Sequence, residues 1–195
     1  MQTGLLFGSF NPVHTGHLII ATFMVDFVGL DEVWFIVSPQ NPLKERDSLV
    51  NETHRYEMVK KALEKYPQLK ESDIEFDMPR PSYTIDTLKK LENDYPEREF
   101  AVIIGTDNID NIDRWKDYKE VVSYRFYIYP RLGSKNEKLS LFSNAKHISA
   151  PVVEISSRFI RKAAGVGKEF RPYLPAEVYE YIKDNKLYSR NSIIG

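Results

Sequence analysis

The first seventeen residues hold the feature that most constrains how this chain can fold. A short apolar run at 5–7 predicts a buried strand, Gly8 interrupts it, and a turn containing Pro12 follows. A helix then begins around His14 and His17. A strand that passes through a glycine-containing turn into a helix presents backbone N–H groups and a positive dipole end to a phosphate. Because the two histidines are three residues apart, both imidazoles can point to that anion. We predict that they donate to a triphosphate.

Other interpretations of the histidine pair stay open. Each imidazole could be a surface or capping residue, and two histidines at this spacing could ligate a metal ion. A metal site is disfavoured, since the sequence has no third ligand in a familiar spacing and no H-E-x-x-H motif. The sequence also lacks the G-x-x-x-x-G-K-[ST] and G-x-G-x-x-G phosphate-binding motifs. The glycine-rich segment 165–168 follows a predicted helix rather than a strand, which argues against a phosphate loop there.

Length and charge narrow the class of protein. A chain of 195 residues favours one domain, or one domain with a small insertion. We predict a single domain that comprises residues 1–195, with a nucleotide-binding core of about 1–165 and a C-terminal helical segment of about 166–190. The net charge of −1 argues against a nucleic-acid polymer or a membrane held by bulk electrostatics. Without cysteine, disulfides and thiolate metal sites are excluded. No targeting segment or membrane-spanning apolar run is present, so we expect a cytoplasmic protein.

The rest of the sequence alternates between predicted strands and predicted helices. Strands are expected at 5–7, 32–37, 74–76, 100–105, 125–129, 147–148 and 152–154. Helices are expected after His14, at 51–66, from 84, within 108–118, from 156 and at 175–185. This alternation predicts right-handed crossovers and an α/β fold with a mainly parallel sheet.

Polar residues follow several predicted strands at their carboxyl ends, where open α/β sheets bind ligands. Lys44 and Arg46 lie in the loop after the second strand and are candidate phosphate contacts or solvated loop charges. Asp107 could accept hydrogen bonds from ribose hydroxyls or could cap a helix. Trp115, in a polar segment, is either a packing anchor or a plate on which a ring stacks.

A second informative segment spans 155–161. Ser156 is expected as the N-cap of a helix, with Ile155 and Ile160 placed to form a hydrophobic staple. Arg158 and Arg161 fall in the first turns, the end of a helix that its dipole makes unfavourable for cations. An anion bound at this helix start would explain them. Arg158 could also be a solvated residue of an amphipathic helix.

These segments resemble the nicotinate-nucleotide adenylyltransferase family, within the superfamily of nucleotidyltransferases that carry the HxGH signature. Residues 8–17, GSFNPVHTGH, resemble the pattern G-[ST]-F-[DN]-P-x-H-x-G-H, and 155–161, ISSRFIR, resemble ISSTxIR. Three further matches are PSYT at 81–84 with Thr87 and Leu88, IIGTD at 103–107 with Trp115, and NKLY at 185–188. The resemblance covers roughly 3–188. The chain departs from the pattern at Phe7, Asn11, Leu43 and Arg158, where the family usually has Gly, Asp, His and Thr.

The resemblance implies a Rossmann-like, doubly wound, mainly parallel sheet with helices on both faces. It also implies a reaction in which a 5′-phosphate oxygen of nicotinate mononucleotide attacks the α-phosphorus of ATP. The products are deamido-NAD and pyrophosphate, in NAD biosynthesis. Mg²⁺ would be carried by the ATP phosphates, with no metal ligand from the protein. The chain could form a homo-oligomer.

The residues implied for this reaction fall into three groups. The catalytic group is His14, His17, Lys44 and Arg161. The ATP-binding group adds Gly8, Ser9, Phe10, Gly105, Asp107, Ile155, Ser156 and Ser157 to His14, His17 and Arg161. The acceptor-binding group is Ser82, Tyr83, Thr84, Trp115 and Arg131.

Alternatives to this function remain at this stage. Pantetheine-phosphate adenylyltransferase shares the ATP-binding motifs and uses a different acceptor. It lacks the S-Y-T segment and the G-x-D…W segment that are present here. Nicotinamide mononucleotide could replace nicotinate mononucleotide as acceptor. A nucleotide sensor without turnover is a third possibility, although it has no need for groups directed at the α-phosphate.

Overall fold

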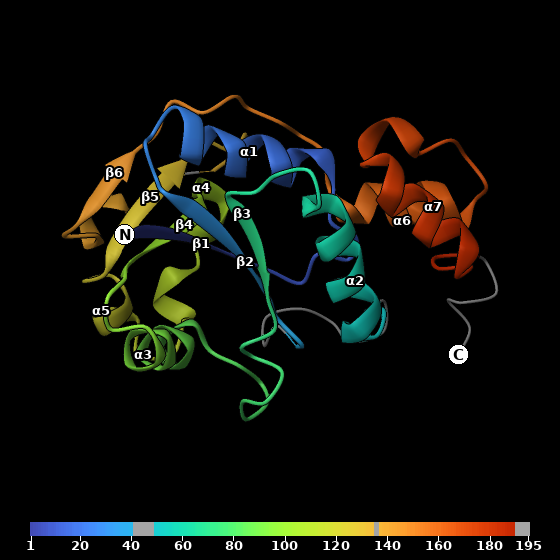
Figure 1. Cartoon of the computed structure of the whole chain (residues 1–195). Coiled ribbons are helices and arrows are strands. Elements are labelled where there is room, and N and C mark those ends of the chain that lie inside the picture. Colours follow the sequence, from blue (N-terminus) through green and yellow to red (C-terminus); the bar gives the residue numbers. More distant parts are fainter. Residues whose placement is uncertain (41–48, 135–136, 190–195) are drawn as a thin grey trace.

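The computed structural model describes residues 1–40, 49–134 and 137–189. In this part of the chain, a six-stranded sheet with only parallel pairings forms the centre of the molecule (Figure 1). Its strands are β1 Gln2–Gly8, β2 Glu32–Val37, β3 Leu69–Ser72, β4 Glu99–Gly105, β5 Arg125–Tyr129 and β6 Ala145–His147. The α-helices are α1 Thr15–Asp26, α2 Glu52–Leu63, α3 Thr84–Asp94, α4 Thr106–Ile109, α5 Tyr118–Val121, α6 Ser157–Gly165 and α7 Ala176–Asp184. No helix of the described residues is long and apolar enough to cross a membrane.

The order of the strands locates the place where a ligand is expected. They lie in the order β3-β2-β1-β4-β5-β6, so the chain builds the sheet outward in one direction from β1 and then in the other from β4. This is the Rossmann order, and the predicted Rossmann-like α/β fold is confirmed. In such sheets the ligand lies in the crevice at the carboxyl ends of the two strands where the order reverses.

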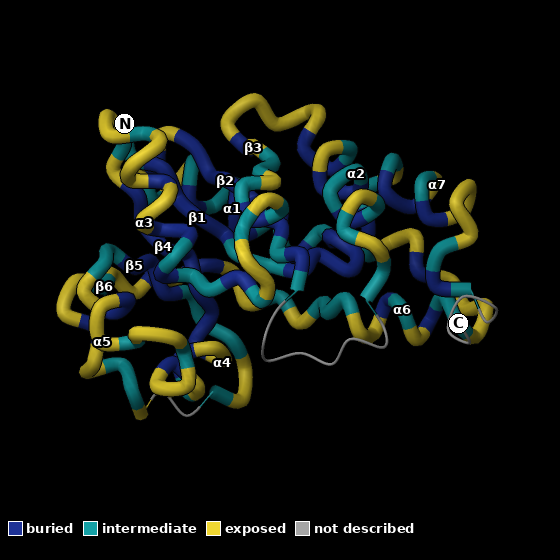
Figure 2. Tube along the Cα trace, turned by 90° about the horizontal axis from the view of Figure 1, so that it is seen from below, coloured by how far each residue is buried: buried dark blue, intermediate teal, exposed yellow. Residues whose placement is uncertain are grey.

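Helices cover both faces of the sheet because alternate residues of each strand point to opposite sides. Leu6 joins a hydrophobic cluster with residues of α1, α2, α6 and α7, whereas Leu5 joins a second cluster with residues of α3, α4 and α5. The tube view shows the central strands as the buried part of the molecule (Figure 2). The predicted near-continuous apolar strand at 32–37 is buried throughout, as a doubly covered strand requires.

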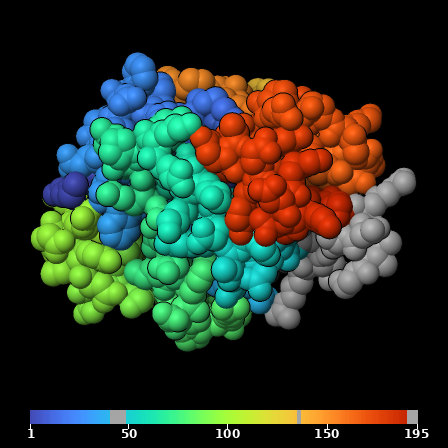
Figure 3. Space-filling view, turned by 45° about the vertical axis from the view of Figure 1, so that its right-hand side comes forward, coloured from blue at the N-terminus to red at the C-terminus, as the bar shows by residue number. Residues whose placement is uncertain are grey.

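The C-terminal segment packs onto the outer side of α2. Helix α7 lies against α2, and the space-filling view shows the last described residues, in red, beside the cyan and teal residues of that region (Figure 3). Val178, Ile182 and Tyr188 belong to the same hydrophobic cluster as α1 and α2. The organisation of 1–195 as a single domain stays a prediction.

Four local predictions were wrong or displaced. Residues 74–76 form a turn rather than a strand, and the third strand is β3, which is hard to detect because Leu69 is its one apolar residue. The helical segment predicted at 108–118 is broken because Trp115 is extended and Asp117 is left-handed. Residues 152–154 form no strand, and the last strand is β6 rather than 147–148.

Candidate active site

A cavity of about 990 Å³ opens at the carboxyl ends of the strands, where the strand order reverses. This volume is at the upper end of the usual range for ligand pockets, roughly 300–1,000 Å³. The predicted site residues that line it are Gly8, Ser9, Phe10, His14, His17, Ser82, Tyr83, Thr84, Gly105, Asp107, Trp115, Arg131, Ile155, Ser156, Ser157 and Arg161. Lys44 and Arg46 lie outside the described residues. The structure therefore brings every described member of the predicted set to one cavity.

The two histidines are stacked at the start of α1. Their ring centroids are 3.7 Å apart with an interplanar angle of 23°, and the ring of Phe10 meets His17 edge-on. The backbone N–H of His14 donates to Nδ1 of His17 over 3.1 Å. Because Nδ1 accepts this bond, the neutral His17 ring carries its proton on Nε2. His17 is thereby fixed as a donor through Nε2.

His14 is held as a neutral ring. It is buried, and its Nδ1 has no hydrogen-bond partner among the described residues. Burial, and after it the positive charge of Arg131, lowers the pKa of His14 from 6.5 to about 4. A neutral His14 avoids placing a second positive charge near Arg131.

The lowered pKa of His14 predicts a pH dependence of stability. As the pH falls from about 7 to about 4.5, the unfolded chain takes up the proton first, so the folded state loses stability. We expect the free energy of unfolding to fall by about 2 kcal/mol more in the wild type than in His14→Gln over this range. Urea unfolding of both proteins at several pH values measures this difference. Parallel curves for the two proteins would contradict a neutral, buried His14.

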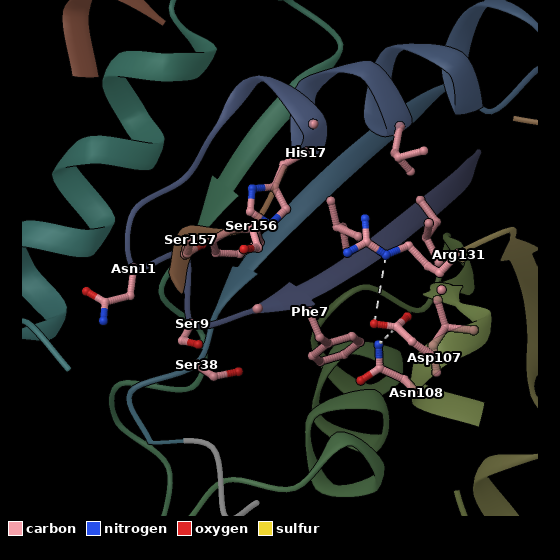
Figure 4. A pocket seen from close by; sticks show the side chains of 18 of the residues that line it. Phe7, Ser9, Asn11, His17, Ser38, Asp107, Asn108, Arg131, Ser156 and Ser157 are labelled. Atoms are coloured by element: carbon pink, nitrogen blue, oxygen red, sulfur yellow. Dashed lines mark hydrogen bonds and ion pairs between the residues drawn. The ribbon is translucent and has the colours of Figure 1, made fainter. Parts of the chain in front are cut away.

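The helix start at α6 meets the turn that precedes α1. Ser156 caps α6, accepting from the backbone N–H of Phe159, as predicted. The hydroxyl of Ser157 donates to the carbonyl of Pro12 over 2.8 Å, and the guanidinium of Arg161 donates to the carbonyl of Asn11 over 2.8 Å. Figure 4 shows Ser156 and Ser157 beside His17. Two helix N-termini from distant parts of the chain thus converge on one cavity.

The ends of β4 and β5 form another wall. Nε of Arg131 lies 3.8 Å from a carboxylate oxygen of Asp107 (Figure 4). The Asp107 side chain is 48% exposed and lies in the first turn of α4, whose N-cap is Gly105, so the alternative of Asp107 as the N-cap was wrong. A Cβ at Gly105 would lie 2.5 Å from Oδ1 of Asp107 and 2.9 Å from Cγ of Arg131, so a side chain there would displace both groups. The positive charge of Arg131 also lies close enough to His14 to lower its pKa. Arg131 therefore lies near a residue that was predicted to bind ATP.

A further wall is formed by the N-terminus of α3. Ser82, Tyr83 and Thr84 line the cavity there, and Ser82 donates over 2.6 Å to a buried carboxylate, Glu75. A second hydroxyl, from Thr87, donates to Glu75 over 2.8 Å. Glu75 was not predicted from the sequence, since nothing in the residues around it distinguishes a buried carboxylate from an exposed one.

Trp115 has both of the properties that the sequence left open. It is partly buried and packs against the hydrophobic cluster of α3, and it also lines the cavity. An indole in this position can anchor its segment and still offer part of its ring to a ligand.

A buried arginine on α2, Arg55, was also not predicted from the sequence. Arg55 is fully buried, and burial lowers its pKa to about 10, so it stays charged at neutral pH. Its guanidinium donates to the carbonyls of Ser9 and Ser38 over 2.7 Å each, to Pro39 over 2.9 Å and, through Nε, to Val50 over 2.8 Å. It therefore ties the turn after β1 to the loop after β2. A signal was present, because Arg55 lies at i, i+3, i+4, i+7 spacing with the buried residues Met58, Val59 and Ala62.

The described residues contain no group of three or more His, Cys, Asp or Glu side chains that could hold a metal ion. The cavity holds helix N-termini, imidazoles and guanidinium groups, which suit anionic phosphates, together with the carboxylates of Asp107 and Glu75.

A cavity of this composition at the reversal point of a Rossmann-type sheet is typical of a nucleotide-binding protein. The family model described as cytidylyltransferase-like matches residues 5–163. A relative from Flavobacterium johnsoniae is 45% identical over 193 residues, which cover 97% of this chain and all of the relative. A second, from Bacteroides fragilis, is 47% identical and covers 93% of this chain and 90% of its own length. Both are named "probable nicotinate-nucleotide adenylyltransferase". The chain belongs to the nicotinate-nucleotide adenylyltransferase family.

Solved structures share the fold. The Plasmodium falciparum nicotinic acid mononucleotide adenylyltransferase, complexed with NaAD, superimposes with a TM-score of 0.82 at 22% identity. The alignment covers 96% of this chain and 97% of the other. A nicotinate-nucleotide adenylyltransferase structure from Vibrio parahaemolyticus, described as putative, superimposes with a TM-score of 0.66 at 19% identity.

Proposed function

We propose that this chain transfers AMP from ATP to nicotinate mononucleotide, producing deamido-NAD and pyrophosphate, in NAD biosynthesis. The observation that carries the proposal is the meeting of the α1 and α6 N-termini at one cavity, joined through Ser157 and Arg161. Two such helix starts with imidazole and guanidinium groups suit the polyphosphate of a nucleoside triphosphate. The names of the relatives and the NaAD complex of the Plasmodium enzyme support the acceptor.

In this reaction the attacking group is the acceptor's 5′-phosphate oxygen, so the protein need not supply a nucleophile. The P–O bond to the α-phosphorus forms as the bond to pyrophosphate breaks, and catalysis depends on positioning and charge stabilisation. His14 and His17 would donate to α- and β-phosphate oxygens, and Arg161 would neutralise developing negative charge. The α6 N-terminus, with Ser156 and Ser157, would hold the β/γ end.

The remaining predicted groups have supporting positions in the cavity. Asp107 is exposed enough to accept hydrogen bonds from the ATP ribose. The α3 N-terminus at Tyr83 and Thr84 would meet the acceptor's carboxylate, and Trp115 would stack on its ring. Arg131 was predicted as an acceptor contact, and it lies beside Asp107. We therefore propose that it contacts a phosphate group at the junction of ATP and the acceptor mononucleotide. Mg²⁺ would enter as part of the MgATP substrate. The role of Lys44 and the cytoplasmic location stay predictions.

Release of pyrophosphate tests the function directly. The chain is incubated with ATP, Mg²⁺ and one acceptor at a time: nicotinate mononucleotide, nicotinamide mononucleotide or phosphopantetheine. We expect turnover with nicotinate mononucleotide and much less with the others. Turnover on phosphopantetheine would make the chain a pantetheine-phosphate adenylyltransferase. ATP binding without release from any acceptor would make it a sensor.

Replacing Trp115 by alanine tests the acceptor half. We expect KM for the acceptor mononucleotide to rise by roughly one to two orders of magnitude, since base–aromatic stacking contributes about 1–3 kcal/mol. KM for ATP is expected to change little. Steady-state kinetics with each substrate varied in turn provides both constants. Trp115→Phe, which keeps an aromatic face, is the matched control, and an unchanged acceptor KM in the alanine variant contradicts stacking.

A further inference from the structure

Asn11 is the meeting point of three distant segments. Its side-chain oxygen accepts from the hydroxyl of Tyr188 over 2.7 Å and, more weakly, from the backbone N–H of Val50 at 3.4 Å. Its backbone carbonyl accepts from Arg161. In Figure 4 the Asn11 side chain turns away from His17 and Ser156, towards α2. Asn11 therefore faces the cavity residues through its backbone and the C-terminal segment through its amide.

Tyr188 reaches this point from the far end of the chain. It lies 177 residues from Asn11, is 3% exposed and belongs to the hydrophobic cluster around α1 and α2. Both Lys186 and Tyr188 adopt positive φ values, 54° and 60°, which residues other than glycine adopt rarely. Burial raises the pKa of the Tyr188 phenol, so the hydroxyl remains a donor. The chain thus maintains an unfavourable backbone conformation where the buried Tyr188 hydroxyl meets Asn11, in the turn between β1 and α1.

We infer that Tyr188 is a positioning residue of the ATP half of the site, acting through Asn11 on Arg161. The Tyr188 hydroxyl fixes the Asn11 amide, and the adjacent Asn11 carbonyl then fixes the guanidinium that lines the cavity. Tyr188 lies beyond residues 5–163, the part matched by the family model, so the C-terminal segment adds a support to the site. This inference rests on the proposed function.

The test compares two tyrosines of the same C-terminal region. Tyr188→Phe removes only the hydroxyl that Asn11 accepts. Tyr181→Phe, the matched control, removes a hydroxyl that is 2.9 Å from Nδ1 of His54 on α2 and that does not line the cavity. We expect kcat/KM for ATP to fall roughly tenfold in Tyr188→Phe, because small displacements of positioned groups have effects of this order. KM for the acceptor and the Tyr181→Phe kinetics should stay within about twofold of the wild type.

A double-mutant cycle with Asn11→Ala shows whether the two residues act together. We expect Tyr188→Phe to cost little further activity once Asn11 is alanine. Independent, multiplying losses would overturn the inference. An unchanged kcat/KM for ATP in Tyr188→Phe would also overturn it, as would an equal loss of kcat/KM in Tyr181→Phe. The same holds if the acceptor KM of Tyr188→Phe rises as much as its kcat/KM for ATP falls, or if its melting curve shows that the variant is unfolded.

If the wild type itself releases no pyrophosphate, the proposed function fails. Calorimetry with ATP then still tests the inference. We expect Tyr188→Phe to bind ATP several-fold more weakly than the wild type, and Tyr181→Phe to bind it as the wild type does.

Discussion

Replacement of His17 by alanine is expected to lower kcat by roughly 10²–10³-fold, the usual loss when one preorganised transition-state donor is removed. The backbone N–H of His14 occupies Nδ1 of His17, so the proton of the neutral ring is on Nε2, the nitrogen left to meet the substrate. This donor is most valuable when charge develops on the phosphates, and therefore ATP affinity should change far less than turnover. Pre-steady-state or steady-state pyrophosphate release, together with calorimetric ATP binding, separates the two quantities.

The matched control for this substitution is His54→Ala. His54 lies on α2, is 2.9 Å from the Tyr181 hydroxyl and does not line the cavity, so its removal should leave kcat nearly unchanged. A His17→Ala variant that keeps near-normal turnover would refute the role we give this imidazole. A loss confined to ATP affinity would instead assign it to ground-state binding.

The second large effect is expected from Arg55→Met, and it concerns stability. Methionine fills much of the same buried space, but it leaves the carbonyls of Ser9, Ser38 and Pro39 without their donor. Each unsatisfied buried acceptor costs about 1–3 kcal/mol, so the free energy of unfolding should fall by about 3 kcal/mol or more. Urea unfolding measures this directly.

Arg80→Met is the matched control for a lost arginine. Arg80 pairs with Glu52 at the surface, where its side chain is 47% exposed, and the expected change is below about 1 kcal/mol. Arg55→Lys should fall between the two, because an ammonium cannot reach all the carbonyls that the guanidinium fork joins. Equal stabilities of Arg55→Met and the wild type would show that water or a relaxed backbone satisfies these carbonyls.

The sequence predicted the parts of this protein that local patterns encode. The apolar run at 32–37 predicted a buried strand and Ser156 predicted a helix start, and both are confirmed. The glycine turn before His14 lines the cavity, and the anion site expected there stays a prediction. The pattern in which strands and helices alternate predicted the parallel sheet. Because carboxyl ends of parallel strands share one edge, residues far apart in sequence could be expected in one cavity.

Buried polar contacts could not be predicted in the same way. Arg55 is satisfied by backbone carbonyls and Glu75 by the hydroxyls of Ser82 and Thr87, and such partners are known only once the chain is folded. The same holds for Tyr188, whose partner Asn11 lies near the other end of the chain. Residues 74–76 were predicted as a strand because Ile74 and Phe76 flank a polar residue. In the structure they form a turn in which Glu75 is buried, and the sequence pattern does not show this burial.

Under the proposed function, the helix starts that hold the polyphosphate and the residues that hold the acceptor lie mainly on opposite faces of the sheet. The helix starts of α1 and α6 belong to one face, whereas α3 and Trp115 pack on the other. Under the proposed function, substitutions around Thr84 or Trp115 are therefore expected to change which mononucleotide is accepted, while the helix starts of α1 and α6 keep their contacts with the ATP phosphates. A protein built in this way lends itself to diversification, since natural variation or directed evolution can exchange one half while the other continues to work.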